Sequence, residues 1–451
     1  MNKSRRITVI AVSLAATAAI GYAQLRTYAS DGALKTIEGQ TFLEVLGSLQ
    51  QLYLDKSKVE TDKLLQGAIN GMLSSLEDPF TSYTPPEDNA LDEEDLSGSF
   101  FGIGVTLEPA NPDGTGSRAA QVYKNQPAAK AGMLAGDEII KVNGEDITKL
   151  TTRQSVRKIR GPKDTDVKLT LRRDGQTLDI TVRRAEVQLF AVETGMLPGD
   201  IGYISINTFY NERIFDQIAA AVKKMNDAGV KKLVLDMRDN GGGLLDGGIF
   251  VADQFLQEGN IVSLRDRNGV ERLPSGPGRT SGKAQKQPTD YTGEMVVLVN
   301  KNSASASEIV AGALQDLGRA KVIGEKTFGK GVAQSVLSLP DGGKVAIVAQ
   351  EWLTPKGRAI QGKGIEPDIV IPDSRRPNVV ALEGSGAAPG TKITVNIGGK
   401  SVELTADKEG RFTYSDTPAR LPTGSDVQGQ ASVDLKNDAQ LQEALKQLGQ
   451  R

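Results

Sequence analysis

Three short segments carry residues that could take part in covalent chemistry, and the first surrounds Ser305. The run NSASASE, from Asn302 to Glu308, stands between an apolar stretch and an amphipathic one. This order predicts a strand, a turn and a helix, whose unpaired N–H groups and positive dipole end would favour a developing negative charge beside the Ser305 hydroxyl. The spacing Ser305-x-x-Glu308 is also that of a capping box, so a structural role is the alternative for the same residues.

The second segment runs from Gly324 to Gly331 and contains Lys330. It differs by one residue from a phosphate-binding Walker A loop, because Gly331 stands where a Ser or Thr would bind Mg²⁺. Residues 332–339 have the pattern of a strand rather than a helix, which argues against a nucleotide-hydrolysing enzyme. A lysine between two glycines has room to turn inward, and a solvated loop lysine is the alternative.

The third segment is the glycine-rich turn from Arg238 to Gly243. It follows an apolar run and precedes a helical pattern, and such a turn exposes several N–H groups that could bind an oxyanion. Asp246 occupies the third glycine position of a dinucleotide-binding pattern, so the spacing gives little support to a nucleotide site. An ordinary tight turn is the alternative here.

The composition links the three segments, because the 451 residues include no His and no Cys. Thiol chemistry, disulfides, cysteine-based zinc sites and Ser-His-Asp arrangements are therefore excluded. A serine nucleophile then needs another base, and a neutral lysine is the usual one. The pKa of that lysine must fall from about 10.4 toward about 7–8, a shift that costs roughly 4 kcal/mol. Uncharged neighbours of Lys330 are compatible with this shift: Phe328, Val332, Ala333 and Gln334.

The elements that position these segments begin after a distinctive N-terminus. Residues 1–29 combine a basic start with an apolar stretch and predict a signal peptide or an N-terminal anchor. Residues 30–95 form an N-terminal helical region, with helical periodicity over 37–80. The acidic stretch over 85–95 is expected to be a solvated linker.

Three further regions follow. Residues 96–185 contain short strand and turn patterns with one helix, over 151–159. Residues 186–374 alternate between strand and helix patterns, which predicts an α/β core with helices packed on a sheet. The expected strands and helices of this core cover 201–206, 215–225, 232–237, 244–255, 261–264, 295–299 and 305–317. Residues 375–451 are polar, with two strand patterns and a final helix over 438–448.

Taken together, these motifs resemble the C-terminal processing (tail-specific) peptidases. Shared features are the serine motif, Lys330 placed 25 residues after Ser305, and Gln334 four residues later. Further matches are Arg238-x-Asn240 with Gly242-Gly243, and the segment from Thr354 to Asp368. The stretch GDEIIKVNG, 136–144, resembles a PDZ domain, at the place where this family inserts one. Gly241 departs from the family's usual proline, Asp164 departs from a usual glycine, and 375–430 has no counterpart in the pattern.

The resemblance implies a role for each motif. Ser305 would be the nucleophile, Lys330 the base, and Gln334 the residue that positions the lysine. The oxyanion hole would use the N–H of Ala306 and that of Gly242 or Gly243. In the PDZ domain, a loop would bind the C-terminal carboxylate of the substrate and an apolar pocket would bind its side chain. The residues implied for these two parts are Phe101, Gly102, Ile103, Gly104, Val156 and Ile159.

The resemblance also implies a fold and a function. The fold would be a ClpP/crotonase-like α/β core with N-terminal helices, an inserted PDZ domain and a β-containing C-terminal segment. The function would be that of an exported serine endopeptidase of the periplasm or cell envelope, which binds apolar protein C-termini and cleaves near them. We expect no cofactor, metal or nucleic acid, and consider a membrane anchor and a homo-oligomer. The alternative is a non-catalytic PDZ adaptor that binds peptides in the envelope.

Overall fold

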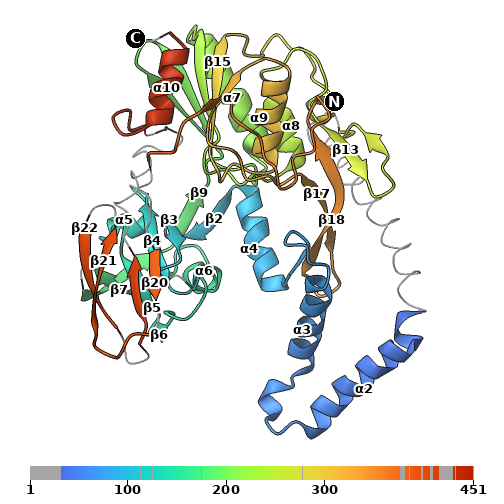
Figure 1. Ribbon diagram of the computed structural model, residues 1–451, viewed down its shortest axis with the longest axis vertical. Helices are drawn as coiled ribbons and strands as arrows, with labels where there is room; N and C mark the ends of the chain where they lie inside the picture. Colours follow the sequence, from blue (N-terminus) through green and yellow to red (C-terminus); the bar gives the residue numbers. More distant parts are fainter. Residues whose placement is uncertain are drawn as a thin grey trace. The chain divides into compact units, whose positions relative to one another are not determined.

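The computed structural model describes residues 32–111, 113–123, 125–173, 175–276, 278–375, 381–384, 386–397, 400–406, 410–415, 430–431 and 433–449 (Figure 1). The expected signal peptide or anchor lies outside these residues. The chain divides into two compact units. The first consists of residues up to Ala90 together with Gln334–Ala349, and the second contains the rest of the chain.

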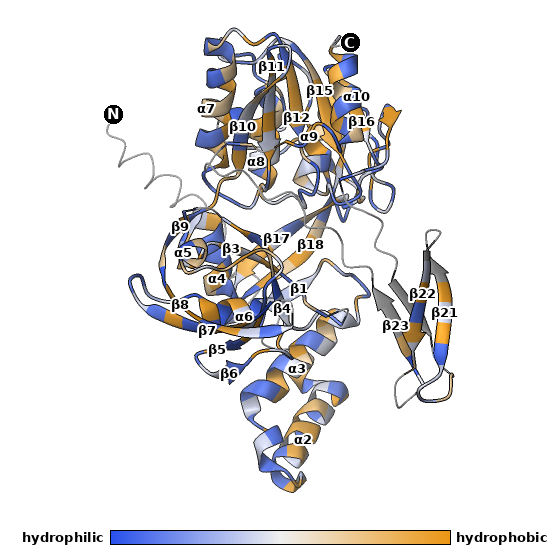
Figure 2. Cartoon of the chain, turned by 90° about the vertical axis from the view of Figure 1, so that its left-hand side faces the viewer, coloured by the Kyte–Doolittle hydropathy of each residue, from blue (hydrophilic) through white to orange (hydrophobic). Residues whose placement is uncertain are grey.

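The first unit contains the N-terminal helices α2 (Ile37–Leu52) and α3 (Thr61–Ser74) and strand β1 (Ser82–Thr84). It also contains most of β17 (Val332–Ser338) and the first part of β18 (Lys344–Leu353). The predicted helical region is thus confirmed. Strand β1 pairs antiparallel with β18, with Ser82 opposite Ala346. Apolar residues recur along α2 (Figure 2), and the side chains of Ile37 and Leu52 are exposed. No helix in the described part of the chain is long and apolar enough to span a membrane.

The acidic stretch over 85–95 is a helix, α4 (Pro86–Ser97), and the expectation of a solvated linker was wrong. Ion pairs explain the difference, because arginines far away in the sequence contact its acidic side chains. Arg153 pairs with Asp92, and Arg160 pairs with Asp95 at 2.6 Å. The guanidinium of Arg160 also lies 3.8 Å from the centre of the Phe100 ring, a cation–π contact that adds to the attraction.

The PDZ-like region forms an antiparallel sheet in the order β3-β4-β5-β7-β8, with β6 beside β5. Alternation of apolar residues along β7, where Val167, Leu169 and Leu171 are buried, places one face on a core. Asp164 has a φ of 62°, which explains why a glycine would suit this position. The elements are β3 (Val105–Glu108), β4 (Ser117–Val122), α5 (Pro127–Lys130), β5 (Glu138–Val142), β6 (Glu145–Asp146), α6 (Thr152–Ile159), β7 (Asp166–Arg173) and β8 (Gln176–Arg183). A two-stranded ribbon of β2 (Ser99–Gly102) and β9 (Ala185–Gln188) flanks this region in sequence.

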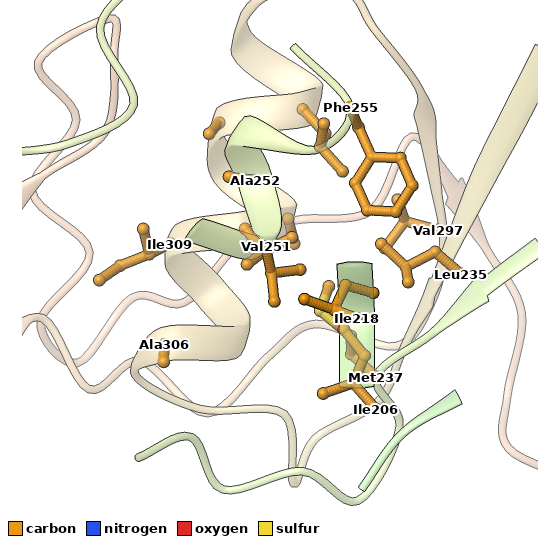
Figure 3. Close-up of a cluster of buried hydrophobic side chains, with 14 of the residues drawn as sticks. Ile206, Ile218, Leu235, Met237, Val251, Ala252, Phe255, Val297, Ala306 and Ile309 are labelled. Atoms are coloured by element: carbon orange, nitrogen blue, oxygen red, sulfur yellow. The ribbon is translucent and has the colours of Figure 1, made fainter. Parts of the chain in front are cut away.

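The predicted α/β core is confirmed as a sheet in the order β10-β11-β12-β15-β16-β19, parallel except for β10. Its strands are β10 (Val192–Leu197), β11 (Ile201–Ile206), β12 (Lys232–Asp236), β15 (Glu294–Val299), β16 (Lys321–Gly324) and β19 (Ile369–Val370). The central strands are continuous apolar runs because both of their faces are covered. One face packs on α7 (Ile214–Asp227), α8 (Leu245–Asp253) and α9 (Ala306–Asp316). Figure 3 shows part of this core, with Leu235 and Val297 facing Phe255.

The other face of the sheet is covered by the C-terminal helix α10 (Ala439–Gln447). Residues that alternate with the first set, such as Val234 and Leu298, pack there against Leu441 and Ala444. The predicted final helix is therefore part of the core, although 68 residues separate it from β19.

Further strands complete the described chain. Strand β18 (Lys344–Leu353) pairs with β13 (Ser263–Asp266), with Ser263 opposite Leu353, and β13 pairs with β14 (Glu271–Arg272). In the polar C-terminal region, β20 (Ala381–Gly384) pairs with β23 (Phe412–Ser415), and β21 (Lys392–Ile397) pairs with β22 (Lys400–Thr405). Strand β17 spans Val332–Ser338, as its sequence predicted.

Candidate active site

Ser305 lies at the turn between β15 and α9, in a backbone conformation that few residues adopt. Its φ is 55° and its ψ is −114°, which costs about 1–3 kcal/mol for a residue with a side chain. Neighbouring contacts hold the turn: Ala304 N donates to the Asn240 carbonyl at 3.0 Å, and Ser303 Oγ donates to the Met237 carbonyl at 2.8 Å. A strained strand-to-helix turn is how other folds expose a nucleophilic serine, and Ser305 is half-buried.

Glu308, in the first turn of α9, connects the Ser305 turn with the Lys330 loop. Its Oε2 accepts the Ser305 N–H at 2.8 Å and the Lys330 N–H at 2.9 Å. Its Oε1 accepts from Thr327 Oγ1 at 2.5 Å and from Gly329 N at 2.7 Å. Ser305 and Glu308 are placed as in a capping box, in which the Glu308 carboxylate accepts the Ser305 N–H. The capping alternative therefore holds for Glu308, and it is compatible with a nucleophilic Ser305.

The Lys330 loop is fixed by its backbone. Trp352 Nε1 donates to the Lys330 carbonyl at 2.9 Å, and Trp352 N donates to the Gly331 carbonyl at 2.9 Å. Because the N–H groups of Ser305 and Lys330 share one oxygen of Glu308, the two backbone nitrogens lie within two hydrogen-bond lengths of each other. The structure thus brings together the backbones of the two residues that the sequence singled out.

The glycine-rich turn between β12 and α8 lies against Ser305. Asn240 fixes the turn, since its Nδ2 donates to the Ile206 carbonyl at 2.7 Å and its Oδ1 accepts the Gly242 N–H at 2.9 Å. A Cβ atom on Gly242 would lie 2.8 Å from Ser305 Cβ and 2.9 Å from Ala306 N. The φ of Gly242 is 94°, so both space and conformation require glycine here.

Two backbone N–H groups beside Ser305, those of Ala306 and Gly243, can donate hydrogen bonds to an oxyanion. The Gly242 N–H is already donated to the Asn240 side chain. Among the described residues, neither the Ala306 N–H nor the Gly243 N–H has an acceptor. This difference favours Gly243 over Gly242 as the second N–H donor of the oxyanion hole, a choice that the sequence left open.

Gln334 lies on β17, in the first compact unit. Its Nε2 donates to the Phe80 carbonyl at 2.5 Å, and its side chain is half-buried. Its role in positioning Lys330 stays a prediction.

A buried charge cluster behind the glycine turn was missed by the sequence analysis. Arg238 donates to both carboxylate oxygens of Asp438, at 2.7 and 2.8 Å, and to Asp236 at 2.5 Å. Burial acts to lower the pKa of Arg238, but the two carboxylates raise it above its ordinary value. Nearby, burial acts to raise the pKa of Asp373, and hydrogen bonds from Arg375 and Asn300 hold it well below its usual range. The available signal was Asp236 at the end of an apolar strand, because a buried carboxylate requires a partner.

The residues implied for peptide binding lie around the first strand of the PDZ-like sheet. Phe101 and Gly102 end β2, whereas Ile103 and Gly104 directly precede β3. Strand β3 is a terminal strand of its sheet, which leaves one edge for an added strand. Phe101 is exposed and Ile103 is buried in the core.

On helix α6, the two residues implied for the apolar pocket differ in burial. Val156 is half-buried, while Ile159 is 4% exposed and belongs to the same core as Ile103. Only Val156 of this pair therefore keeps appreciable exposed surface.

Three parts of the chain match known protein families. Residues 200–371 match peptidase family S41, and residues 118–173 match the PDZ domain. Residues 23–87 match a family described as the N-terminal domain of the activating protease CtpB.

Individual proteins are similar over most of this chain. A probable CtpA-like serine protease of Staphylococcus aureus (strain COL) is 38% identical over 315 residues, which are 70% of this chain and 61% of that protein. A probable CtpA-like serine protease of Staphylococcus epidermidis is 37% identical over 315 residues, with 70% and 62% covered. The chain thus matches less than two thirds of the length of these relatives. The solved photosystem II D1 C-terminal processing protease is 30% identical, with 75% of this chain and 94% of that chain covered and a TM-score of 0.47.

Proposed function

This chain belongs to peptidase family S41, and we propose that it is a serine-type C-terminal processing peptidase. The observation that carries the proposal is the shared hydrogen bonding of Ser305 and Lys330 to one oxygen of Glu308. This contact places a strained serine beside a lysine-bearing loop in a protein without histidine.

The proposed reaction follows an acyl-enzyme path. The neutral amine of Lys330 takes the proton of the Ser305 hydroxyl, and Ser305 Oγ attacks the carbonyl carbon of the peptide bond. The oxyanion that forms accepts hydrogen bonds from the N–H groups of Ala306 and of Gly243 or Gly242. Lys330 then gives the proton to the leaving amine, and a water molecule activated by the same lysine hydrolyses the ester. Gln334 would orient the lysine amine through a hydrogen bond.

We propose that substrates are proteins or peptides with apolar C-termini. The C-terminal segment would add as a strand to the open edge of β3, with its carboxylate at the loop from Phe101 to Gly104. Val156 and Ile159 would contact the apolar side chain. Cleavage near the C-terminus follows if the PDZ-bound end delivers the preceding segment to Ser305.

The proposed domain division is residues 1–29 as a signal peptide or anchor, 30–95 as the N-terminal helices, 96–185 as the PDZ domain, 186–374 as the peptidase core and 375–451 as the C-terminal region. The basic and apolar start of the chain supports export to the periplasm or cell envelope. We propose no cofactor for the reaction, because a serine and a lysine suffice for it.

The test is cleavage of a defined peptide with an apolar C-terminus, with the products identified by mass spectrometry. Ser305→Ala and Lys330→Ala should each abolish cleavage and leave the thermal unfolding temperature close to that of the wild type. Lys326→Ala is the matched control, because Lys326 lies in the same loop, is exposed and pairs only loosely with Glu366 at 3.6 Å. Wild-type activity should rise with pH between about 6 and 9 as the lysine loses its proton. Full activity in either variant, or binding of the peptide without any turnover by the wild type, would contradict the proposal.

A further inference from the structure

Glu308 is a fully buried carboxylate whose hydrogen bonds are all directed at the candidate active site. Its exposed fraction is 0%, and its two oxygens accept four hydrogen bonds between 2.5 and 2.9 Å. Three of the donors are backbone N–H groups, those of Ser305, Gly329 and Lys330. A carboxylate offers about four lone-pair positions, so these contacts use its full accepting capacity.

The fourth donor is a hydroxyl, and all four contacts favour the charged form of Glu308. Thr327 Oγ1 already accepts the Ile365 N–H at 2.6 Å, and its own proton is left to donate to Glu308. On Oε2 both donors are backbone N–H groups, so a proton on that oxygen would displace one of them. Burial raises the pKa of Glu308, while the four hydrogen bonds act against that rise by favouring the charged form.

The two contacts of Oε2 link the Ser305 turn with the Lys330 loop, although Ser305 and Lys330 are 25 residues apart in the sequence. One bond holds the N–H of the strained Ser305, and the other holds the N–H of Lys330. Any shift of the Lys330 loop relative to the Ser305 turn must lengthen one of these two bonds. The contacts of Oε1 lie entirely on the loop side, at Thr327 and Gly329.

We propose that Glu308 is a positioning residue, which sets the separation of the Ser305 hydroxyl and the Lys330 amine by binding both backbones through one oxygen atom. It touches neither substrate nor reacting atoms. The inference rests on the proposed function, because the separation matters only if Ser305 and Lys330 react as a pair. A misplacement of about 1 Å between reacting groups can reduce a rate by about 10²-fold.

The test compares Glu308→Gln with Thr327→Val in the full chain. Glutamine preserves the size of the side chain but offers a single oxygen, so its amide must face one of the two donor pairs. Thr327→Val removes one donor to Glu308 and the contact with Ile365, but leaves both bonds of Oε2 in place. We expect Glu308→Gln to lower kcat by about 10²-fold at an unchanged KM, and Thr327→Val to stay within about threefold of the wild type. Rates are expressed per active site, titrated with a peptide boronate.

A second measurement does not depend on catalysis. Hydrogen exchange followed by mass spectrometry, in a Ser305→Ala background, reports the protection of peptides that contain residues 303–306 and 327–331. Glu308→Gln should accelerate exchange in both segments together, and Thr327→Val should affect the second segment alone.

The outcomes separate the two proposals. Equal turnover by wild type and Glu308→Gln overturns the positioning role and leaves the peptidase function intact. A similar loss of kcat in both variants also overturns it, since a general loosening of the pocket would then explain the effect. If the wild type does not cleave the peptide, the proposed function fails. If Glu308→Gln does not accelerate hydrogen exchange in residues 303–306 and 327–331 together, the positioning inference also fails. If Glu308→Gln does not fold, Glu308→Asp replaces it: the shorter arm cannot hold both N–H groups, and full activity of that variant refutes the proposal.

Discussion

The C-terminal helix α10 should stabilise the glycine turn beside Ser305, and the substitution Asp438→Asn tests this. Asp438 is the N-cap of α10, and its Oδ1 accepts the Leu441 N–H at 3.0 Å. The same carboxylate accepts two hydrogen bonds from Arg238, the first residue of the turn. The side chains of Arg238 and Asp438 are 2% and 5% exposed. Asparagine keeps the size and the capping oxygen, but it removes the charge and turns one acceptor into a donor.

The expected loss follows from burial. Breaking a buried ion pair on one side costs about 3–5 kcal/mol, because the remaining charge stays buried without its partner. Arg238 keeps its contact with Asp236, so the lower end of this range, about 3 kcal/mol, applies. With a urea dependence of about 3 kcal/mol per molar, the unfolding midpoint should fall by about 1 M.

The assay is urea unfolding followed by tryptophan fluorescence. Trp352 is the sole tryptophan of the chain and is 1% exposed in the core of the second unit. Lys446→Gln is the matched control on the same helix, because the Lys446 side chain is 73% exposed and its pair with Glu443 should contribute less than about 1 kcal/mol. A midpoint change below about 0.3 M for Asp438→Asn, or an equal change in the control, would refute the reasoning.

Two further predictions concern single contacts. Gly242→Ala should lower kcat by about 10²–10³-fold, because the added Cβ would press on Ser305 and Ala306 and displace the oxyanion donors. The control is Gly241→Ala, which adds a Cβ where there is open space and should leave kcat near the wild-type value. Equal kcat values for the two variants would contradict this account. The hydrogen bond from Tyr83 to Asp341 raises the pKa of Tyr83 to about 12, so its contribution to stability is complete below about pH 10 and is lost as pH rises through about 12. Asp341→Asn should return this pKa toward about 10, as measured by the ultraviolet absorbance of tyrosinate with Tyr83→Phe to assign the signal, and an unchanged titration would show that Asp341 is not the cause.

Local patterns were sufficient to predict most elements of the second unit. Strands β12 and β15 are apolar runs that are buried on both faces, and such runs are readable from composition alone. Helix α10 was predicted over 438–448 and spans Ala439–Gln447, because the aspartate N-cap marks its start. The absence of His and Cys excluded catalysis by imidazole or thiol groups, and this exclusion needs no structural information.

Helix α4 shows where local patterns fail. An acidic segment without a clear apolar face predicts a solvated linker, since nothing within it indicates burial. The arginines that pair with it, Arg153 and Arg160, lie about sixty residues away. Their contribution depends on the fold of the PDZ-like region and cannot be read from the segment.

By itself, the sequence excluded histidine and cysteine chemistry, predicted a serine that acts with a lysine, and singled out Ser305, Lys330 and the glycine turn. Tertiary structure decided three further matters: the strained conformation of Ser305, the sharing of Glu308 between two loops, and the pairing of Arg238 with Asp438, 200 residues further along the chain. The physical reason is the same in each case. Spacing along the chain specifies which groups are present, whereas a buried hydrogen bond or ion pair depends on distances that are set only when separate segments pack together.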